Sequence, residues 1–75
     1  MSKVEEIERH GVESFKIVSD LLATIGEGKA NDGTARAVRL FNSIVLECAE
    51  SVAKETGEDV LDVIHRISET VRSER

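Results

Sequence analysis

Apolar residues recur at alternating steps of three and four through most of the chain, which is the spacing of one face of an α-helix. The pattern is clearest over residues 33–55, where no glycine or proline stands between Gly33 and Gly57. The apolar stripe of this stretch consists of Val38, Phe41, Val45, Cys48 and Val52. We therefore predict one long central helix, against which the other segments pack.

A second helix is predicted over residues 3–25, with Ser2 as its N-cap. Its stripe alternates strictly over three heptads, like a coiled-coil seam. The stripe consists of Val4, Ile7, Gly11, Ser14, Val18, Leu21 and Ile25. Glycine costs about 1 kcal/mol in a helix relative to alanine. Gly11 therefore marks either the close approach of another helix or a kink, and the spacing alone leaves both open.

A third helix is predicted over residues 57–73, after a break at Gly57. Its stripe consists of Val60, Ile64, Ile67 and Val71. The glycine-rich segment 26–33 is short, which makes the first two helices antiparallel neighbours. The expected fold class is all-α, either a three-helix antiparallel bundle or a helical hairpin with a short third helix.

Seventy-five residues suffice for one domain with a thin core, and a single cysteine excludes a disulfide within the chain. Stability must then come from regular helix packing, from oligomerisation, or from both. Among the apolar residues outside the predicted stripes, we expect five to form contact surfaces with a second copy or another protein. They are Val12, Ile17, Leu40, Leu46 and Val63. We predict a homodimer or a higher oligomer.

The composition narrows the possible partners. A net charge of −5 argues against general nucleic-acid binding, which depends on neutralising phosphates, and 3% aromatic residues leave few stacking platforms for single strands. The charged N-terminal stretch does not resemble a signal peptide, and no apolar run approaches the roughly 18 residues of a membrane span. We expect a cytoplasmic protein with no membrane contact.

The central helix has its charges in the reverse of the usual order, with Arg36 and Arg39 early and acidic residues late. An up-down-up arrangement would gather basic residues beside the 26–33 loop, where free amides favour an anion. This predicted basic pole consists of Lys29, Arg36, Arg39, Arg72 and Arg75. Alternatively, Arg36 and Arg39 pair with acids of the neighbouring helix and loop, namely Asp20, Glu27 and Asp32.

Other chemistry has weaker support. A Cys48–His65 nucleophilic dyad is conceivable, but Cys48 lies on an apolar stripe and free cysteine is commonly a buried, inert residue. Acid pairs at 47–50 and 59–62 would need to project into one cleft to hold Mg²⁺. A helix-turn-helix over 53–63 would point acids at phosphate. We expect no catalytic residue, metal or cofactor.

The leading hypothesis from these features is a small acidic non-enzymatic binding protein, acting as an adaptor, inhibitor or regulator through protein contacts. The five apolar residues outside the stripes would supply the contact surface, with Arg36 and Arg39 giving orientation. The alternative hypothesis is a binder of a phosphorylated small molecule or nucleotide, held at the basic pole by Lys29, Arg36, Arg39 and Arg72.

Overall fold

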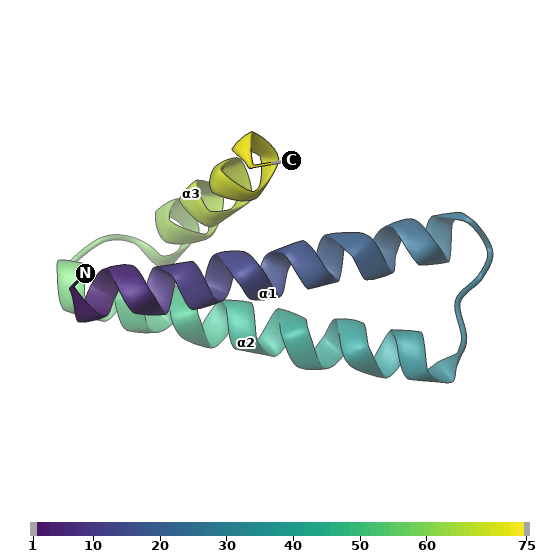
Figure 1. The fold of residues 1–75 in the computed structure, drawn as a ribbon. Helices are drawn as coiled ribbons and strands as arrows, with labels where there is room; N and C mark the ends of the chain where they lie inside the picture. Colours follow the sequence, from purple (N-terminus) through teal and green to yellow (C-terminus); the bar gives the residue numbers. More distant parts are fainter. Residues whose placement is uncertain (1, 75) are drawn as a thin grey trace.

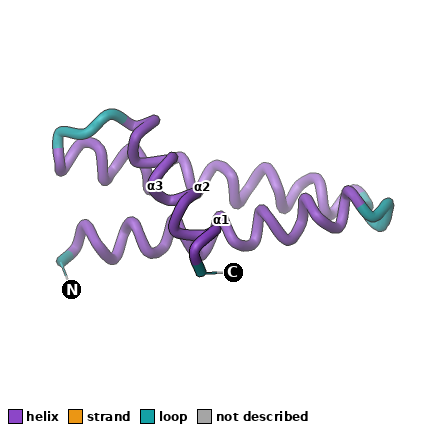
Figure 2. Tube along the Cα trace, turned by 90° about the horizontal axis from the view of Figure 1, so that it is seen from above, coloured by secondary structure: helices purple, strands orange, loops and turns teal. Residues whose placement is uncertain are grey.

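The computed structural model describes residues 2–74 and has three helices within them, which confirms the all-helical class. They are α1 (Lys3–Gly26), α2 (Asp32–Thr56) and α3 (Val60–Ser73). The long helices α1 and α2 lie side by side as a hairpin, and α3 crosses one side of it (Figure 1). Seen from above, α3 lies over the half of the hairpin that holds the N-terminus, and its C-terminal end lies near the hairpin's middle (Figure 2). We call the other half, which ends in the 27–31 loop, the distal half.

Short-range signals set the helix ends. The side chain of Ser2 accepts a hydrogen bond from the backbone N–H of Glu5, which caps α1. At the start of α2, Asn31 and Thr34 each accept a hydrogen bond from the other's backbone N–H, forming a reciprocal capping box. Gly57, at a φ of 77°, ends α2 in the left-handed conformation that glycine adopts without steric cost.

The predicted start of the third helix at residue 57 is wrong, since α3 begins at Val60. The N-cap is Asp59, whose carboxylate accepts a hydrogen bond from the backbone N–H of Leu61 at 2.8 Å. Thr56 does not cap α3, because it still belongs to α2 and donates its hydroxyl to the carbonyl of Val52. The residues between Thr56 and Val60 therefore form the turn that redirects the chain across the hairpin.

The core lies where all three helices meet. Its buried members are Val12, Ala49, Val52, Ala53, Val63, Ile67 and Val71. The prediction that Val12 and Val63 form an external contact surface is wrong, because they are only 2% and 0% exposed. Since α3 crosses the flank of α1, α1 needs a second apolar side in addition to its stripe, and Val12 supplies it. Val63 lies four residues before Ile67, on the face of α3 that packs into the core.

Gly11 lies at the centre of this junction, and its role follows from its surroundings. A Cβ atom at this position would lie 3.1 Å from Cδ1 of Ile67 in α3 and 3.2 Å from Cβ of Cys48 in α2. The helix continues through Gly11 from Lys3 to Gly26. The structure therefore favours close approach over a kink as the reason for this glycine.

We predict that Gly11→Val lowers the free energy of unfolding by about 1–3 kcal/mol, because the branched side chain would force α2 and α3 away from α1. Valine has a better helix propensity than glycine, so any loss must come from crowding. Urea denaturation followed by circular dichroism measures the effect. Ala23→Val, at an exposed position of the same helix, is the control and should change stability by less than about 0.5 kcal/mol. Wild-type stability in Gly11→Val would contradict close packing at this site.

Candidate functional site

The fold does not assemble the predicted basic pole. Three of its members lie toward the distal end, with Lys29 in the loop and Arg36 and Arg39 in the early turns of α2. Arg72 lies elsewhere, because α3 ends beside the middle of the hairpin, well short of the loop (Figure 1). Arg75 lies outside the described residues. A site that depends on all four cations of the phosphate-binding hypothesis is therefore not formed.

The pairing of these cations also differs from expectation. Lys29 pairs with Glu27 at 3.3 Å, and Arg72 with Glu69 at 3.0 Å on its own helix. Within residues 2–74, neither Arg36 nor Arg39 has a carboxylate within ion-pair distance. Both are exposed near the N-terminus of α2, where positive charge opposes the helix dipole. The fold therefore leaves these two arginines available to an acidic partner.

Most of the strong ion pairs fasten α3 to the hairpin. The guanidinium of Arg66 donates to both carboxylate oxygens of Glu8 in α1, at 2.5 and 3.0 Å, and to Glu58 at 2.5 Å. This fork-shaped pairing is the strongest geometry available to arginine. Hydrogen bonds from Arg66 and then from Thr56 lower the pKa of Glu58 to about 2.

A second fastening lies at the other end of α3. The carboxylate of Glu74 accepts hydrogen bonds from Arg9 at 2.5 Å and from Lys16 at 2.6 Å, both in α1. Hydrogen bonds from these two cations, Arg9 before Lys16, lower the pKa of Glu74 to about 2. The two fastenings hold α3 against one flank of α1, which fixes the side of the hairpin that α3 covers.

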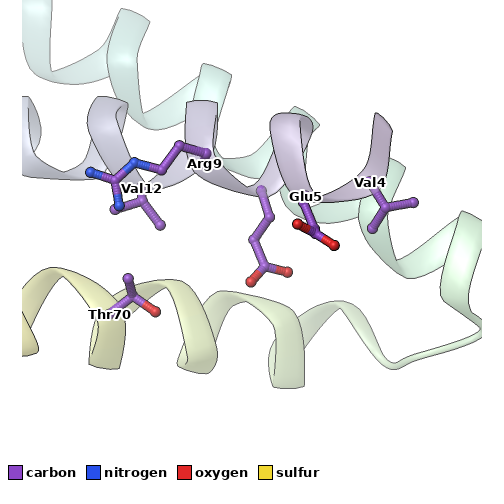
Figure 3. Close-up of a pocket in the computed structure, with 6 residues that line it drawn as sticks. Val4, Glu5, Arg9, Val12 and Thr70 are labelled. Carbon is purple, nitrogen blue, oxygen red and sulfur yellow. The ribbon is translucent and has the colours of Figure 1, made fainter. Parts of the chain in front are cut away.

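A small open pocket of about 190 Å³ lies between α1 and α3. Figure 3 shows Val4, Glu5, Arg9 and Val12 along α1 facing Thr70 of α3. The remaining lining residue, Glu8, is held by Arg66, and Arg9 is held by Glu13 and Glu74. No buried side-chain polar atom in the described part of the chain lacks a partner. The pocket is thus a shallow gap beside these ion pairs, and two of its charged lining residues, Glu8 and Arg9, are already paired within the chain.

The candidate catalytic and metal-ligating residues do not come together. Cys48 is buried, and burial followed by the charge of Glu47 raises the pKa of its thiol, which disfavours the nucleophilic thiolate. His65 is exposed on α3 and faces Glu69 of its own helix at 3.9 Å. Across residues 2–74, no group of three or more His, Cys, Asp or Glu side chains is placed to hold a metal ion.

The remaining feature is apolar and lies in the distal half of the hairpin. Gly11 lies against Cys48. Because α1 and α2 are antiparallel, a residue n positions after Gly11 lies opposite the residue n positions before Cys48. Ile17 therefore lies opposite Asn42 along the hairpin axis, and Leu21 lies opposite Val38. The pair Ile17 and Leu21 on α1 and the pair Leu40 and Ile44 on α2 then lie at similar heights, each pair with i, i+4 spacing.

Helix geometry places these four residues on the side of the hairpin away from α3. Two residues nine positions apart are about two and a half turns apart, so their side chains lie on opposite sides of the helix. Each of the four residues is nine positions from a residue that faces α3. Those residues are Glu8, which bonds Arg66, and Val12, Ala49 and Ala53, which belong to the core shared with α3. Ile17 and Leu40 are 40% and 61% exposed, and Leu21 and Ile44 are half-buried. We call Ile17, Leu21, Leu40 and Ile44 the uncovered face.

The sequence pattern predicts only part of this face. Ile17 and Leu40 are exposed, as predicted for contact residues outside the stripes, while Leu21 belongs to a predicted stripe and Ile44 is not among the predicted contact residues. Leu46 is 41% exposed. It lies seven residues, about two full turns, before Ala53, and is therefore on the same side of α2 as α3. The available signal was the matching i, i+4 spacing of Ile17 with Leu21 and of Leu40 with Ile44, beside the main seams.

Comparisons with protein-family models, with curated proteins and with solved structures each found no match to this chain. Within residues 2–74, no helix is both long and apolar enough to cross a membrane.

We predict that Glu58→Gln/Glu74→Gln reduces stability most at neutral pH. Both carboxylates have a folded pKa of about 2 and an unfolded value near 4.3, so their pairing stabilises the fold above about pH 5 and is lost toward pH 2. The urea midpoint measured from pH 2 to pH 7 should differ from wild type at pH 7 and converge near pH 2.

Glu50→Gln is the matched control, because Glu50 is exposed and has no ion-pair partner among residues 2–74. It should keep the wild-type pH profile. A double variant whose difference from wild type stays constant across this pH range would show that the two carboxylates do not act through their charge.

Proposed function

We propose that this chain is a small non-enzymatic interaction protein that acts as an adaptor, inhibitor or regulator by binding a helical partner. The observation that carries the proposal is the uncovered face, where four large aliphatic side chains lie outside the core formed with α3. Recognition between helices uses apolar anchors at i, i+4 spacing, and both α1 and α2 present such a pair.

The energetics support a binding role for this face. Complete burial of a large aliphatic side chain contributes about 1.5–3 kcal/mol. Ile17 and Leu40 keep 40% and 61% of their surface exposed, so covering them supplies on the order of 2 kcal/mol before the half-buried Leu21 and Ile44 are counted. A short chain with a thin core gains much from such a contact.

Charge supports the same role. Arg36 and Arg39 lie in the same distal half of α2 as Leu40, and neither has an ion-pair partner among residues 2–74. Basic side chains at the border of an apolar contact steer an acidic partner and set its orientation more than they add affinity. The proposed binding site therefore combines an aliphatic centre with basic residues at its border on α2.

We predict that Ile17→Ser/Leu40→Ser abolishes association while leaving the fold intact, because both residues are substantially exposed. Sedimentation velocity over a concentration series measures self-association. A photo-cross-linking residue at position 40 in cells measures capture of another protein. Leu61→Ser is the matched control, since Leu61 is 73% exposed but lies on α3.

The wild type and Leu61→Ser should associate, and Ile17→Ser/Leu40→Ser should not, with helical circular dichroism unchanged in all three. Equal association of all three proteins would contradict a role for the uncovered face. A wild type that remains monomeric and forms no cross-link through position 40 would contradict the proposed function.

A further inference from the structure

We infer that the uncovered face binds a second copy of the chain, with the twofold axis running along the hairpin, so that α1 of each copy lies against α2 of the other. The inference rests on the proposed function and names the partner for the same face. Two copies would form a four-helix bundle with both α3 helices outside it, because α3 lies on the opposite side of each hairpin (Figure 1).

The apolar residues are self-complementary in this arrangement. The pairs Ile17 with Leu21 and Leu40 with Ile44 lie at similar heights, because Gly11 fixes the register of the antiparallel helices against Cys48. Rotation about an axis parallel to the helices leaves each residue's position along the hairpin unchanged. Each apolar pair of α1 therefore meets an apolar pair of α2 of the other copy. Two half-formed apolar layers then become closed layers of a bundle core.

The charged borders select this axis over its alternative. The outer edge of α1 beside the uncovered face is acidic, with Glu6, Glu13 and Asp20 at seven-residue spacing. The corresponding edge of α2 holds Arg36 and Arg39 in its distal half and Lys54 near its other end, with the acids Glu47 and Glu50 between them. A twofold axis perpendicular to the helices would instead place α1 against α1 and α2 against α2 of the other copy. The acids of α1 would then face acids, and the arginines of α2 would face arginines. Like charges in apposition are disfavoured.

The register also specifies individual contacts. Glu6 is level with Ala53, which places it beside the second copy's Lys54. Neither Glu6 nor Lys54 has an ion-pair partner within residues 2–74. Farther along, the second copy's Arg39 lies level with this acidic edge. Glu13, which would face the second copy's Glu47, is already paired with Arg9 of its own chain.

The test is a charge exchange between Glu6 and Lys54, measured as the dimer dissociation constant by sedimentation at low salt. Glu6→Lys and Lys54→Glu should each raise the constant about tenfold, because each contact occurs twice in the dimer. The variant that carries both substitutions should return to within about threefold of wild type, because the pair is restored with its signs exchanged. Lys29→Glu, which makes the same change in net charge as Lys54→Glu but at the loop, should have less than about a twofold effect.

The outcomes separate this inference from the proposed function. A dimer in which the double exchange fails to restore affinity would overturn the axis, while binding through the uncovered face would stand. A monomer that cross-links to another protein through position 40 would overturn the second copy as partner and keep the proposed function. A wild-type protein that neither self-associates nor cross-links through position 40 would overturn both the inferred dimer and the proposed function. Restoration by the double exchange, together with loss of dimer in Ile17→Ser/Leu40→Ser, is the expected result.

Discussion

The fourteen residues of α3 span about 21 Å, whereas the twenty-five of α2 span about 37 Å, and this mismatch shapes the molecule. In addition, α3 crosses the hairpin instead of running along it (Figure 2), so the three-helix core is confined to one half, around Gly11. Beyond it, the distal half is a two-helix structure in which aliphatic side chains remain partly exposed.

Both close packing and ion pairs hold α3 against the hairpin. At the junction, the missing side chain of Gly11 lets Ile67 and Cys48 approach the α1 backbone. Around the rim, Arg66 joins Glu8 to Glu58, while Glu74 joins Arg9 to Lys16. These pairs are partly exposed, and exposed ion pairs contribute modestly to stability. Their main effect is on the position of α3, because they fix the flank of α1 that α3 occupies and leave the opposite side of the hairpin uncovered.

The function we propose follows from that asymmetry. The charged side chains beside α3 are largely engaged within the chain, among them Glu8 and Arg9 of the pocket. On the opposite side, Leu40 and its neighbours have no third helix to cover them, and Arg36 and Arg39 have no acidic partner among residues 2–74. A surface with an aliphatic centre and charged borders is suited to another helical pair.

The sequence by itself determined the helical class and most of the helix ends, because hydrophobic periodicity, caps such as Ser2 and stops such as Gly57 act within a few residues. It also marked Gly11 as unusual but left close approach and a kink open, and the tertiary structure decided for close approach. Only the tertiary structure decided that Val12 and Val63 are core, and that Arg72 lies apart from Arg36 and Arg39. Those outcomes depend on the direction in which α3 crosses the hairpin. That direction is set by contacts between residues more than fifty positions apart, such as Glu8 with Arg66, which local patterns do not encode.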